Sequence, residues 1–248
     1  MPTVHELYEL WADDSELRDA LTRSLDPRGP DWLLDVFGSL GPQRDDLLVD
    51  VGARDGKHSA ELASRHSVRV VALDPVPQHP DVRVGTAEEL PFGDGEVDWI
   101  WCRDVLSHVD VPRALAEFAR VLRPGGAAVV YVTLPTELLE PHEAAMLADA
   151  CALTHVTAAQ IETAARDAGL RERTVERLGS EWREAMAESG RWDPAKDLLS
   201  LARLLRRREE LAARYGDAAV DAAWGGLVWG VYQVLGKLCP TVYVWERP

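Results

Sequence analysis

The segment Leu47–Ser59, LLVDVGARDGKHS, constrains the fold of this chain more than any other feature of it. Its apolar run is typical of a buried strand, and the glycines that follow indicate a tight turn into a helix. On open α/β sheets, nucleotide-type cofactors bind at such a turn. A dinucleotide-binding turn needs a glycine where Arg54 stands here, because the backbone must approach a pyrophosphate. The turn therefore predicts a cofactor that lacks a pyrophosphate.

Apolar runs and helical segments alternate along the chain after this point. The runs that predict strands are Leu47–Val51, Val68–Leu73, Val82–Val84, Trp99–Trp101 and Ala127–Thr133. Ser59–Arg65 and Arg113–Leu122 are the clearest helices between them, and the Pro-Gly-Gly of Arg120–Gly126 is interpreted as the stop of the second helix. This alternation predicts an α/β fold with a doubly wound, mostly parallel sheet and helices on both of its faces.

We expect one domain with four parts. Residues 1–40 hold N-terminal helices (Val4–Ser24 and Asp31–Leu40), 45–181 the cofactor-binding core, 182–238 an inserted helical cap, and 241–248 the last strand, TVYVWERP. The core is expected to be helical over 136–169, with a loop near His155, and then to form an edge strand, LRERTVERL. The segment Ala218–Gly236 is almost as apolar as a membrane span, but its glycines and Asp221 favour a packed helix.

Composition limits the partners and the location. With 27 Lys+Arg against 42 Asp+Glu, the formal net charge is −15, which disfavours nucleic acid because cations must neutralise its phosphates. Cys102, Cys151 and Cys239 lie far apart without a CxxC pair, so neither disulfides nor a zinc site are indicated, and no metal is predicted. The N-terminus lacks the pattern of a signal peptide, and we expect a cytoplasmic protein that does not bind membranes.

Two carboxylates end the first two predicted strands. Asp74 closes the run in VVALDP and can accept hydrogen bonds from both hydroxyls of a ribose. Asp50 is expected to face the same crevice and suits a ligand with an ammonium or sulfonium charge. Together the two carboxylates predict a cationic cofactor that contains a ribose.

Four segments between Leu47 and Thr133 resemble, in this order, the class I S-adenosylmethionine-dependent methyltransferases. They are VDVGARDG, VVALDP, GTAEELPFGDGEVDWIWCRDVLSHV and ALAEFARVLRPGG. The resemblance is to the small-molecule group that includes ubiquinone/menaquinone-type methyltransferases. It implies S-adenosylmethionine as the cofactor and a Rossmann-like sheet of seven strands whose last strand is antiparallel, and TVYVWERP is similar to that strand.

The resemblance also implies which residues bind the cofactor. Asp50, Gly52, Ala53 and Gly56 would lie at its methionine part, Asp74 and Pro75 at the ribose, Thr86, Ala87 and Glu88 at the adenine, and Arg103 and Asp104 between the cofactor and the substrate. The family usually has a glycine in place of Arg54 and often an acidic residue in place of Thr86. An arginine that points away from the cofactor would be tolerated, and a threonine hydroxyl can still bond the adenine amino group.

Two histidines are candidate general bases. Methyl transfer from a sulfonium is an in-line displacement, so a base is needed only for a protonated acceptor. The family often places one or two histidines at the position of His108, although Ser107 replaces the first of that pair here. His142 with Glu143 forms the second candidate, as base and partner or as metal ligands. A structural histidine and a charged helix start are the respective alternatives.

Aromatic residues of the cap are candidate substrate contacts. Trp182, Trp229 and Tyr232 are assigned to the substrate, and Trp229 and Tyr232 share one helix face with Gln233. Packing in a core is the alternative for them; if they line a pocket, the acceptor is aromatic or hydrophobic. The basic segment RLLRRREELAARYG is interpreted as an amphipathic helix whose apolar face is formed by Leu201, Leu204, Leu205 and Leu211.

These features predict an enzyme that methylates a small organic molecule, a specialised metabolite, at O, N or C. The alternative is a cofactor-binding protein that does not transfer methyl groups, either a regulatory module or a fold recruited for another reaction such as a cyclisation. The departures at Arg54, Thr86 and Ser107 motivate it. A nucleic-acid methyltransferase is disfavoured, because CRDV stands where base-amino methyltransferases carry [DN]PP[YFW]. The sequence specifies neither the acceptor nor the oligomeric state.

Overall fold

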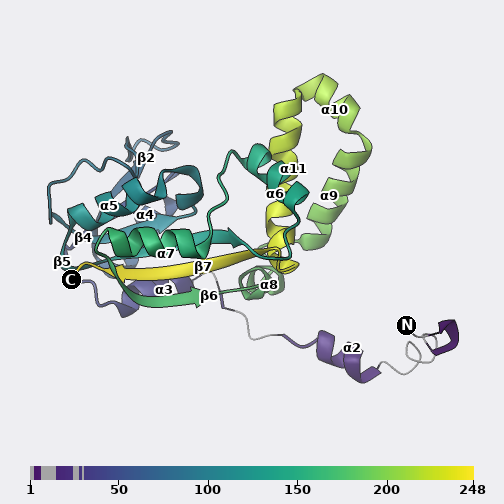
Figure 1. The fold of residues 1–248 in the computed structure, drawn as a ribbon, viewed down its shortest axis with the longest axis horizontal. Helices are drawn as coiled ribbons and strands as arrows, with labels where there is room; N and C mark the ends of the chain where they lie inside the picture. Colours follow the sequence, from purple (N-terminus) through teal and green to yellow (C-terminus); the bar gives the residue numbers. More distant parts are fainter. Residues whose placement is uncertain (1–2, 7–14, 25–27, 30) are drawn as a thin grey trace.

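The centre of the molecule is a seven-stranded sheet with the order β3-β2-β1-β4-β5-β7-β6 (Figure 1). The computed structural model describes residues 3–6, 15–24, 28–29 and 31–248. The strands are β1 (Leu47–Val51), β2 (Arg69–Asp74), β3 (Val82–Val84), β4 (Val97–Arg103), β5 (Leu122–Pro135), β6 (Arg171–Arg177) and β7 (Leu238–Glu246). Neighbours from β3 to β5 pair in parallel, whereas β7 lies antiparallel between β5 and β6. The predicted Rossmann-like fold with an antiparallel last strand is confirmed.

Helices cover both faces of this sheet. The first face packs against α3 (Trp32–Ser39) and α4 (Lys57–His66), and the second against α5 (Val111–Val121) and α7 (Ala158–Asp167). Side chains of β4 alternate accordingly. Trp99 and Trp101 lie in the core beside α3, whereas Ile100 and Cys102 lie in the core beside α5. Arg103 follows in the phase of the two tryptophans, which directs it to the α3 and α4 side.

Local signals fix the helices next to the strand ends. The Asp110 side chain accepts a hydrogen bond from the Arg113 amide (3.0 Å) at the start of α5, and Pro112 occupies its first turn. At α7 the side chains and amides of Thr157 and Gln160 form a reciprocal capping box. Both helices therefore begin where these residues place them, on the same edge of the sheet as the carboxyl ends of the parallel strands.

Strand β5 begins earlier than the sequence predicts. Rather than stopping α5 and preceding the strand, the Pro-Gly-Gly segment belongs to β5, which starts at Leu122. A Cβ atom on Gly126 would stand 2.7 Å from the Asp98 carbonyl oxygen, so glycine is needed for the two strands to approach here. The register between β4 and β5 shifts at the same place, between Val97 and Trp99.

The cap consists of helices from two segments of the chain. They are α6 (Pro141–Cys151), which follows β5, and α8 (Glu181–Glu188), α9 (Pro194–Arg206), α10 (Arg208–Tyr215) and α11 (Asp217–Val234), which lie between β6 and β7. Leu147 of α6 and Leu204 of α9 share a core with Val220, Trp224 and Val228 of α11. The limits drawn for the four parts of the chain stay a prediction.

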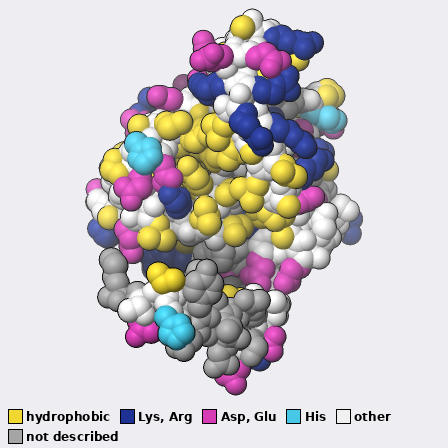
Figure 2. Space-filling view, turned by 90° about the vertical axis from the view of Figure 1, so that its right-hand side faces the viewer, with side chains coloured by type: hydrophobic (Ala, Val, Ile, Leu, Met, Phe, Trp, Pro, Cys, Tyr) yellow, Lys and Arg dark blue, Asp and Glu magenta, His cyan; other side chains and the backbone are white. Residues whose placement is uncertain are grey.

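Part of the apolar surface of α9 faces outward. Leu204 is buried as expected, but Leu205 is 54% exposed, because adjacent helix positions differ in direction by about 100°. Leu198 and Leu199 are exposed as well. Figure 2 shows a broad apolar area on the side of the molecule that carries the cap, with basic side chains along its upper edge. No helix among the described residues is both long and apolar enough to cross a bilayer.

At the N-terminal end, the described helices are α2 (Ser15–Leu21) and α3. The predicted helix Asp31–Leu40 corresponds to α3. The predicted helix Val4–Ser24 falls partly on residues 7–14, which lie outside the described residues.

Candidate functional site

A cavity of about 540 Å³ lies at the carboxyl ends of β1, β2 and β4. We call it the cofactor cavity. Its lining residues are Val51, Gly52, Arg54, Asp74, Pro75, Gly85, Thr86, Ala87, Glu88, Arg103, Asp104, Val105, His108 and Val109. Most of the residues assigned to the cofactor from the sequence are therefore gathered around one space. Asp50, Ala53 and Gly56 are the assigned residues that do not line it.

The glycine turn is held closely against the end of β2 and the segment after β4. The amides of Gly52 and Ala53 both donate to the Leu73 carbonyl oxygen, at 2.8 and 2.9 Å. Gly52 has a φ of +79°, and a Cβ atom there would lie 2.2 Å from a methyl group of Val105. A side chain at this position would thus be both strained and blocked, which explains the glycine.

Asp74 presents a fixed carboxylate to the cavity. Its Oδ2 accepts a hydrogen bond from the Arg54 amide (2.9 Å), and its Oδ1 accepts one from the Val76 amide (2.8 Å). Each carboxylate oxygen offers a further lone pair for a ligand hydroxyl. The side chain is therefore oriented before a ligand arrives.

Arg54 fits the turn because its head group is engaged elsewhere. The residue adopts a φ of +48°, and its Nε donates to the side-chain oxygen of Gln78 (3.1 Å). The backbone amide of Gln78 in turn donates to the Arg54 carbonyl oxygen (2.9 Å). The arginine thus borders the cavity while its guanidinium is tied to the segment after β2.

Asp50 is buried beside the cavity and does not open into it. It is 2% exposed, and the Ser59 hydroxyl of α4 donates to its Oδ2 at 2.5 Å. Burial raises the pKa of Asp50 to about 6, although the Ser59 hydrogen bond and the nearby Arg103 charge favour the ionised form. Because its carboxylate does not line the cavity, it can favour a cation there through its electric field.

Asp104 lies at the opposite wall of the cavity, in a strained backbone conformation. It has a φ of +53°, and its amide donates to the Tyr131 carbonyl oxygen (2.8 Å). The hydroxyl and the amide of Thr133 donate to its Oδ1, at 2.9 and 3.2 Å. Burial raises the pKa of the Asp104 carboxyl against the opposing effect of Arg103. The side chain is held in place by β5 and binds a proton more readily than an exposed aspartate does.

Arg103 is surrounded by rings rather than by carboxylates. Its Nη1 lies 2.7 Å from the His58 Nε2, and its guanidinium carbon lies 5.3 Å from the Tyr131 ring and 6.0 Å from the Trp182 ring. Burial and the Arg103 charge lower the pKa of His58 to about 4, so the neutral imidazole accepts this hydrogen bond. His58 is not predicted from the sequence, where its only signal is its place as the second residue of the helix after the glycine turn.

Three comparisons with known proteins agree with this geometry. Residues 49–130 match a family model described as a methyltransferase domain. Over 113 residues the chain is 39% identical to an uncharacterised methyltransferase of Mycobacterium bovis, a match that covers 42% of this chain and 43% of the relative. A putative sarcosine dimethylglycine methyltransferase from Galdieria sulphuraria shares the fold, with a TM-score of 0.67 and 19% identity over 88% of this chain and 83% of that chain.

The match over residues 49–130 and the likeness of the fold confirm the predicted resemblance to the class I S-adenosylmethionine-dependent methyltransferases. A second solved structure widens the range of reactions on this fold. The [4+2]-cyclase SpnF has a TM-score of 0.64 and 21% identity over 88% of this chain and 80% of that chain. The chain spans less than half the length of the curated Mycobacterium relative that it matches.

The cofactor cavity of the methyltransferase domain fits S-adenosylmethionine. Its volume lies within the range of small-molecule sites. Asp74 offers free lone pairs that suit ribose hydroxyls, and two further carboxyl groups, Asp104 in the lining and the buried Asp50, suit a cationic ligand. Glu88 borders the cavity and accepts a hydrogen bond from the Asp110 amide (3.1 Å), which ties the predicted adenine segment to the start of α5.

The two candidate bases of the methyltransferase domain lie in different places. His108 lines the cofactor cavity, and its Nδ1 lies 3.0 Å from the Ala152 carbonyl oxygen. His142 is exposed at the start of α6 and does not line it. Its neighbour Glu143 completes a capping box and binds Lys237, which favours the structural interpretation of this helix start. No group of three potential metal ligands occurs within the described part of the chain.

The predicted substrate aromatics are also separated. Trp182 is buried and reaches the Arg103 and Tyr131 side chains, 5.7 Å from the Tyr131 ring centre. Trp229 and Tyr232 pack in the cap core, where the Tyr232 hydroxyl donates to Glu143 (3.3 Å). Neither of the two lines the cofactor cavity. The assignment of all three to the substrate stays a prediction, and Trp182 is the one with a contact at the site.

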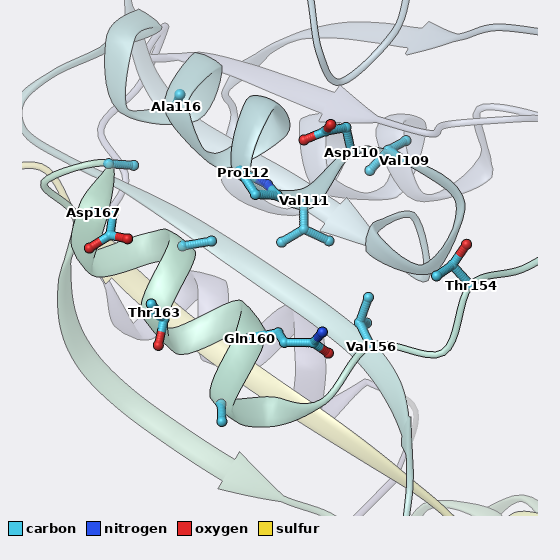
Figure 3. A pocket seen from close by; sticks show the side chains of 13 residues that line it. Val109, Asp110, Val111, Pro112, Ala116, Thr154, Val156, Gln160, Thr163 and Asp167 are labelled. Atoms are coloured by element: carbon cyan, nitrogen blue, oxygen red, sulfur yellow. The ribbon is translucent and has the colours of Figure 1, made fainter.

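Volume alone does not select the active site. A cavity of about 820 Å³ lies between α5 and α7, where Gln160 and Thr163 face Val111, Pro112 and Ala116 (Figure 3). Its walls are mostly small apolar side chains, and none of the residues predicted for cofactor, substrate or catalysis lines it. The smaller cofactor cavity holds the oriented carboxylates.

Proposed function

We propose that this protein transfers a methyl group from S-adenosylmethionine to a small organic molecule, at an oxygen, nitrogen or carbon atom. The observation that carries the proposal is the Asp74 carboxylate, which two backbone amides orient at the edge of the cofactor cavity. When bound, S-adenosylmethionine supplies a methyl group attached to a positively charged sulfur.

Different residues of the cavity are assigned to cofactor binding and to the acceptor. Asp74 binds the ribose, the segment from Thr86 to Glu88 borders the adenine, and the bare backbone at Gly52 leaves room for the methionine part. Asp104 faces the acceptor. Because its pKa is raised, the Asp104 carboxylate can take a proton from an acceptor hydroxyl or ammonium group. Thr133 donates a hydrogen bond to Oδ1, which leaves Oδ2 to receive the proton. His108 remains the second candidate for this role.

The acceptor is inferred to be a small molecule from two supports. The net charge of −15 opposes nucleic acid, and the Galdieria neighbour is named for sarcosine and dimethylglycine. Specialised metabolism, an aromatic acceptor and a cytoplasmic location remain predictions from the sequence.

A recruited reaction on the same fold is the second candidate. The likeness to the cyclase SpnF favours it, together with the departures at Arg54 and Ser107. Arg54 has a structural explanation in its bond to Gln78, which weakens this alternative. Both candidates require a cofactor site, so binding has to be measured before reaction.

The test is calorimetric titration of S-adenosylmethionine and S-adenosylhomocysteine into the intact chain and into Asp74→Ala. We expect micromolar binding that weakens about tenfold to a hundredfold in the variant, since hydrogen bonds to a charged group contribute about 1.5–3 kcal/mol. Asp81→Ala, which removes a carboxylate that is 90% exposed, is the matched control and should bind normally. Absence of binding to the intact chain would refute the proposal.

A further inference from the structure

A further cavity, of about 220 Å³, lies on the side of the sheet that carries α3 and α4. Its lining residues are Asp31, Leu33, Leu34, His58, Glu61, Trp101, Arg103 and Arg191, and we call it the Arg103 subsite. Arg103 is the residue that lines both this subsite and the cofactor cavity. The space is several times the ~30 Å³ that one water occupies in the liquid, so it can hold a small organic group.

Trp101, which lines the Arg103 subsite, has a hydrogen-bond donor without an acceptor. Trp101 is 1% exposed, and its indole Nε1 has no hydrogen-bond partner. Trp99 lies two positions earlier on the same face of β4, and its Nε1 donates to Asp46 at 2.8 Å. Buried donors are rarely left unpaired in folded proteins, so the Trp101 indole indicates an acceptor that comes from outside the chain.

The charges around the subsite also call for an acceptor. Arg103 donates to a neutral imidazole, and its charge also acts on Asp50 and Asp104, but within the described ranges no ion pair within 4 Å joins Arg103 or Arg191 to a carboxylate. The two acids of the rim are already engaged, because Arg65 lies 3.1 Å from Glu61 and 3.9 Å from Asp31. The Trp101 indole therefore lacks an acceptor, whereas the two acids of the rim already have Arg65 as a partner.

We propose that the Arg103 subsite binds a carboxylate of the methyl acceptor. A planar carboxylate matches the fork of the Arg103 guanidinium and has a second oxygen for the Trp101 indole. The ring of Trp101 and the side chains of Leu33 and Leu34 supply an apolar wall for the carbon atoms beside it. An acceptor anchored in this way reaches past Arg103 toward the cofactor cavity. The inference rests on the proposed function for the identity of the ligand as acceptor.

The carboxylate of the cofactor is the competing source of the same chemistry. The subsite contains His58 but no residue of the turn Gly52–Gly56, and the two cavities are joined only through Arg103 among their lining residues. This separation favours the acceptor. The test has to distinguish the two carboxylates directly.

The experiment uses the indole N–H signals of the ¹⁵N-labelled full chain, with Trp101→Phe to assign the Trp101 signal. Benzoate is titrated into the chain saturated with S-adenosylhomocysteine, and benzamide serves as the uncharged match. We expect benzoate to move the Trp101 signal downfield and benzamide to leave it in place. A Trp101 signal that stays still with benzoate, or that moves equally with benzamide, overturns the proposal.

Variants supply the affinity test. Trp101→Phe keeps the ring and removes the donor, and we expect it to weaken benzoate about tenfold or more, as the loss of a hydrogen bond to a charged group does. Arg191→Gln should weaken benzoate as well. Trp99→Phe is the matched control from the same strand and face, and it should leave benzoate affinity unchanged. Equal affinity in Trp101→Phe and in the unchanged chain also overturns the proposal.

The outcomes separate this inference from the proposed function. S-adenosylhomocysteine alone should leave the Trp101 signal in place; a shift caused by it, with benzoate then excluded, assigns the subsite to the cofactor and overturns the inference. Cofactor binding without benzoate binding defeats the inference and preserves the proposed function. Benzoate binding at Trp101 without any cofactor binding defeats the proposed function and leaves a carboxylate site of another purpose.

Discussion

Asp50 shows at the scale of one residue how a ligand site and stability oppose each other. Its carboxyl is almost fully buried, and its Oδ2 accepts a hydrogen bond from the Ser59 hydroxyl. An ionised group in such a place is costly for the fold, yet a negative field beneath the turn favours a cationic ligand above it. The ionised Asp50 carboxylate thus lowers the stability of the folded chain, and it also favours a cationic ligand at the site.

The free-energy cost of ionising the buried Asp50 carboxyl predicts how the stability of the fold changes with pH. The Asp50 pKa rises from 3.8 to about 6 on folding, so the folded chain keeps a proton that the unfolded chain loses. Its contribution to the unfolding free energy is therefore complete below pH 3.8 and is lost as the pH rises through 6, a change of about 3 kcal/mol. Asp50→Asn removes this dependence. Urea unfolding of both chains at pH 4 and 7 should show the stability difference shifting by that amount in favour of the variant.

The exposed Asp81→Asn is the control, and its difference from the unchanged chain should stay nearly constant with pH. A constant difference for Asp50→Asn as well would show that the carboxyl does not bear the cost that its burial indicates.

The sequence predicts residues of the cofactor cavity where their role is local. Asp74 and Gly52 can be predicted because a strand end and a turn each produce a pattern of consecutive residues. Thr133 and His58 are not, because Thr133 meets Asp104 from 29 positions away and His58 meets Arg103 from 45 positions away. Such partners depend on strand order and register, which no short motif contains.

At the scale of elements, one ion pair joins the two segments of the cap. Lys237 follows α11, and its Nζ lies 2.5 Å from both carboxylate oxygens of Glu143 in α6. The side chains are 22% and 17% exposed, so solvent screens the pair only in part. Lys237 also lies 5.4 Å from the centre of the Tyr232 ring. The contact fixes α6 against the end of α11.

Lys237→Met should therefore lower the unfolding free energy by about 2 kcal/mol at pH 7, because it leaves a partly buried carboxylate without its partner. The Lys237 hydrogen bond lowers the pKa of Glu143, so the stabilisation is present above the ordinary pKa of 4.5 and is lost as the pH falls through the lowered value. Chemical denaturation at several pH values measures both effects.

Arg207→Met provides the comparison within the same cap. It breaks the pair between Arg207 and Glu210, whose side chains are 55% and 60% exposed, and should cost much less stability than Lys237→Met because solvent screens the pair. Equal losses in the two variants would mean that the link between α6 and α11 contributes no more than a surface pair.

Elements with strong periodicity are predictable and their edges are not. The apolar run of β1 is buried at all five positions, which is why it is visible in the sequence. The start of β5 is hidden because its Pro-Gly-Gly reads as a helix stop, whereas Gly126 serves the approach of β4. The aromatic residues of α11 could not be assigned to pocket or core from spacing alone, since both uses produce the same stripe.

At the scale of the whole molecule, the sheet order places the cofactor cavity beside the centre of the sheet and the cap farther along it. The cavity is formed at β1, β2 and β4, whereas α6 and α11 pack near β5 and β7 (Figure 1). Arg103 stands between the cavity and the Arg103 subsite. Cofactor binding and acceptor binding are therefore expected to involve different walls.

Hydrogen exchange with and without S-adenosylhomocysteine tests this division. At a ligand concentration 100 times its dissociation constant, binding adds about 2.7 kcal/mol to any opening that releases the ligand, which slows exchange about a hundredfold. The slowed amides should be those of the turn around Gly52 and Arg54 and of the segment from Arg103 to Val109, since both contain residues that line the cavity. Helices α9 and α10 have no residue in its lining and should exchange at unchanged rates. Protection spreading over α9 and α10 would contradict separate walls and show that the cap closes on the cofactor, and Asp74→Ala under the same conditions should lose the protection at the turn.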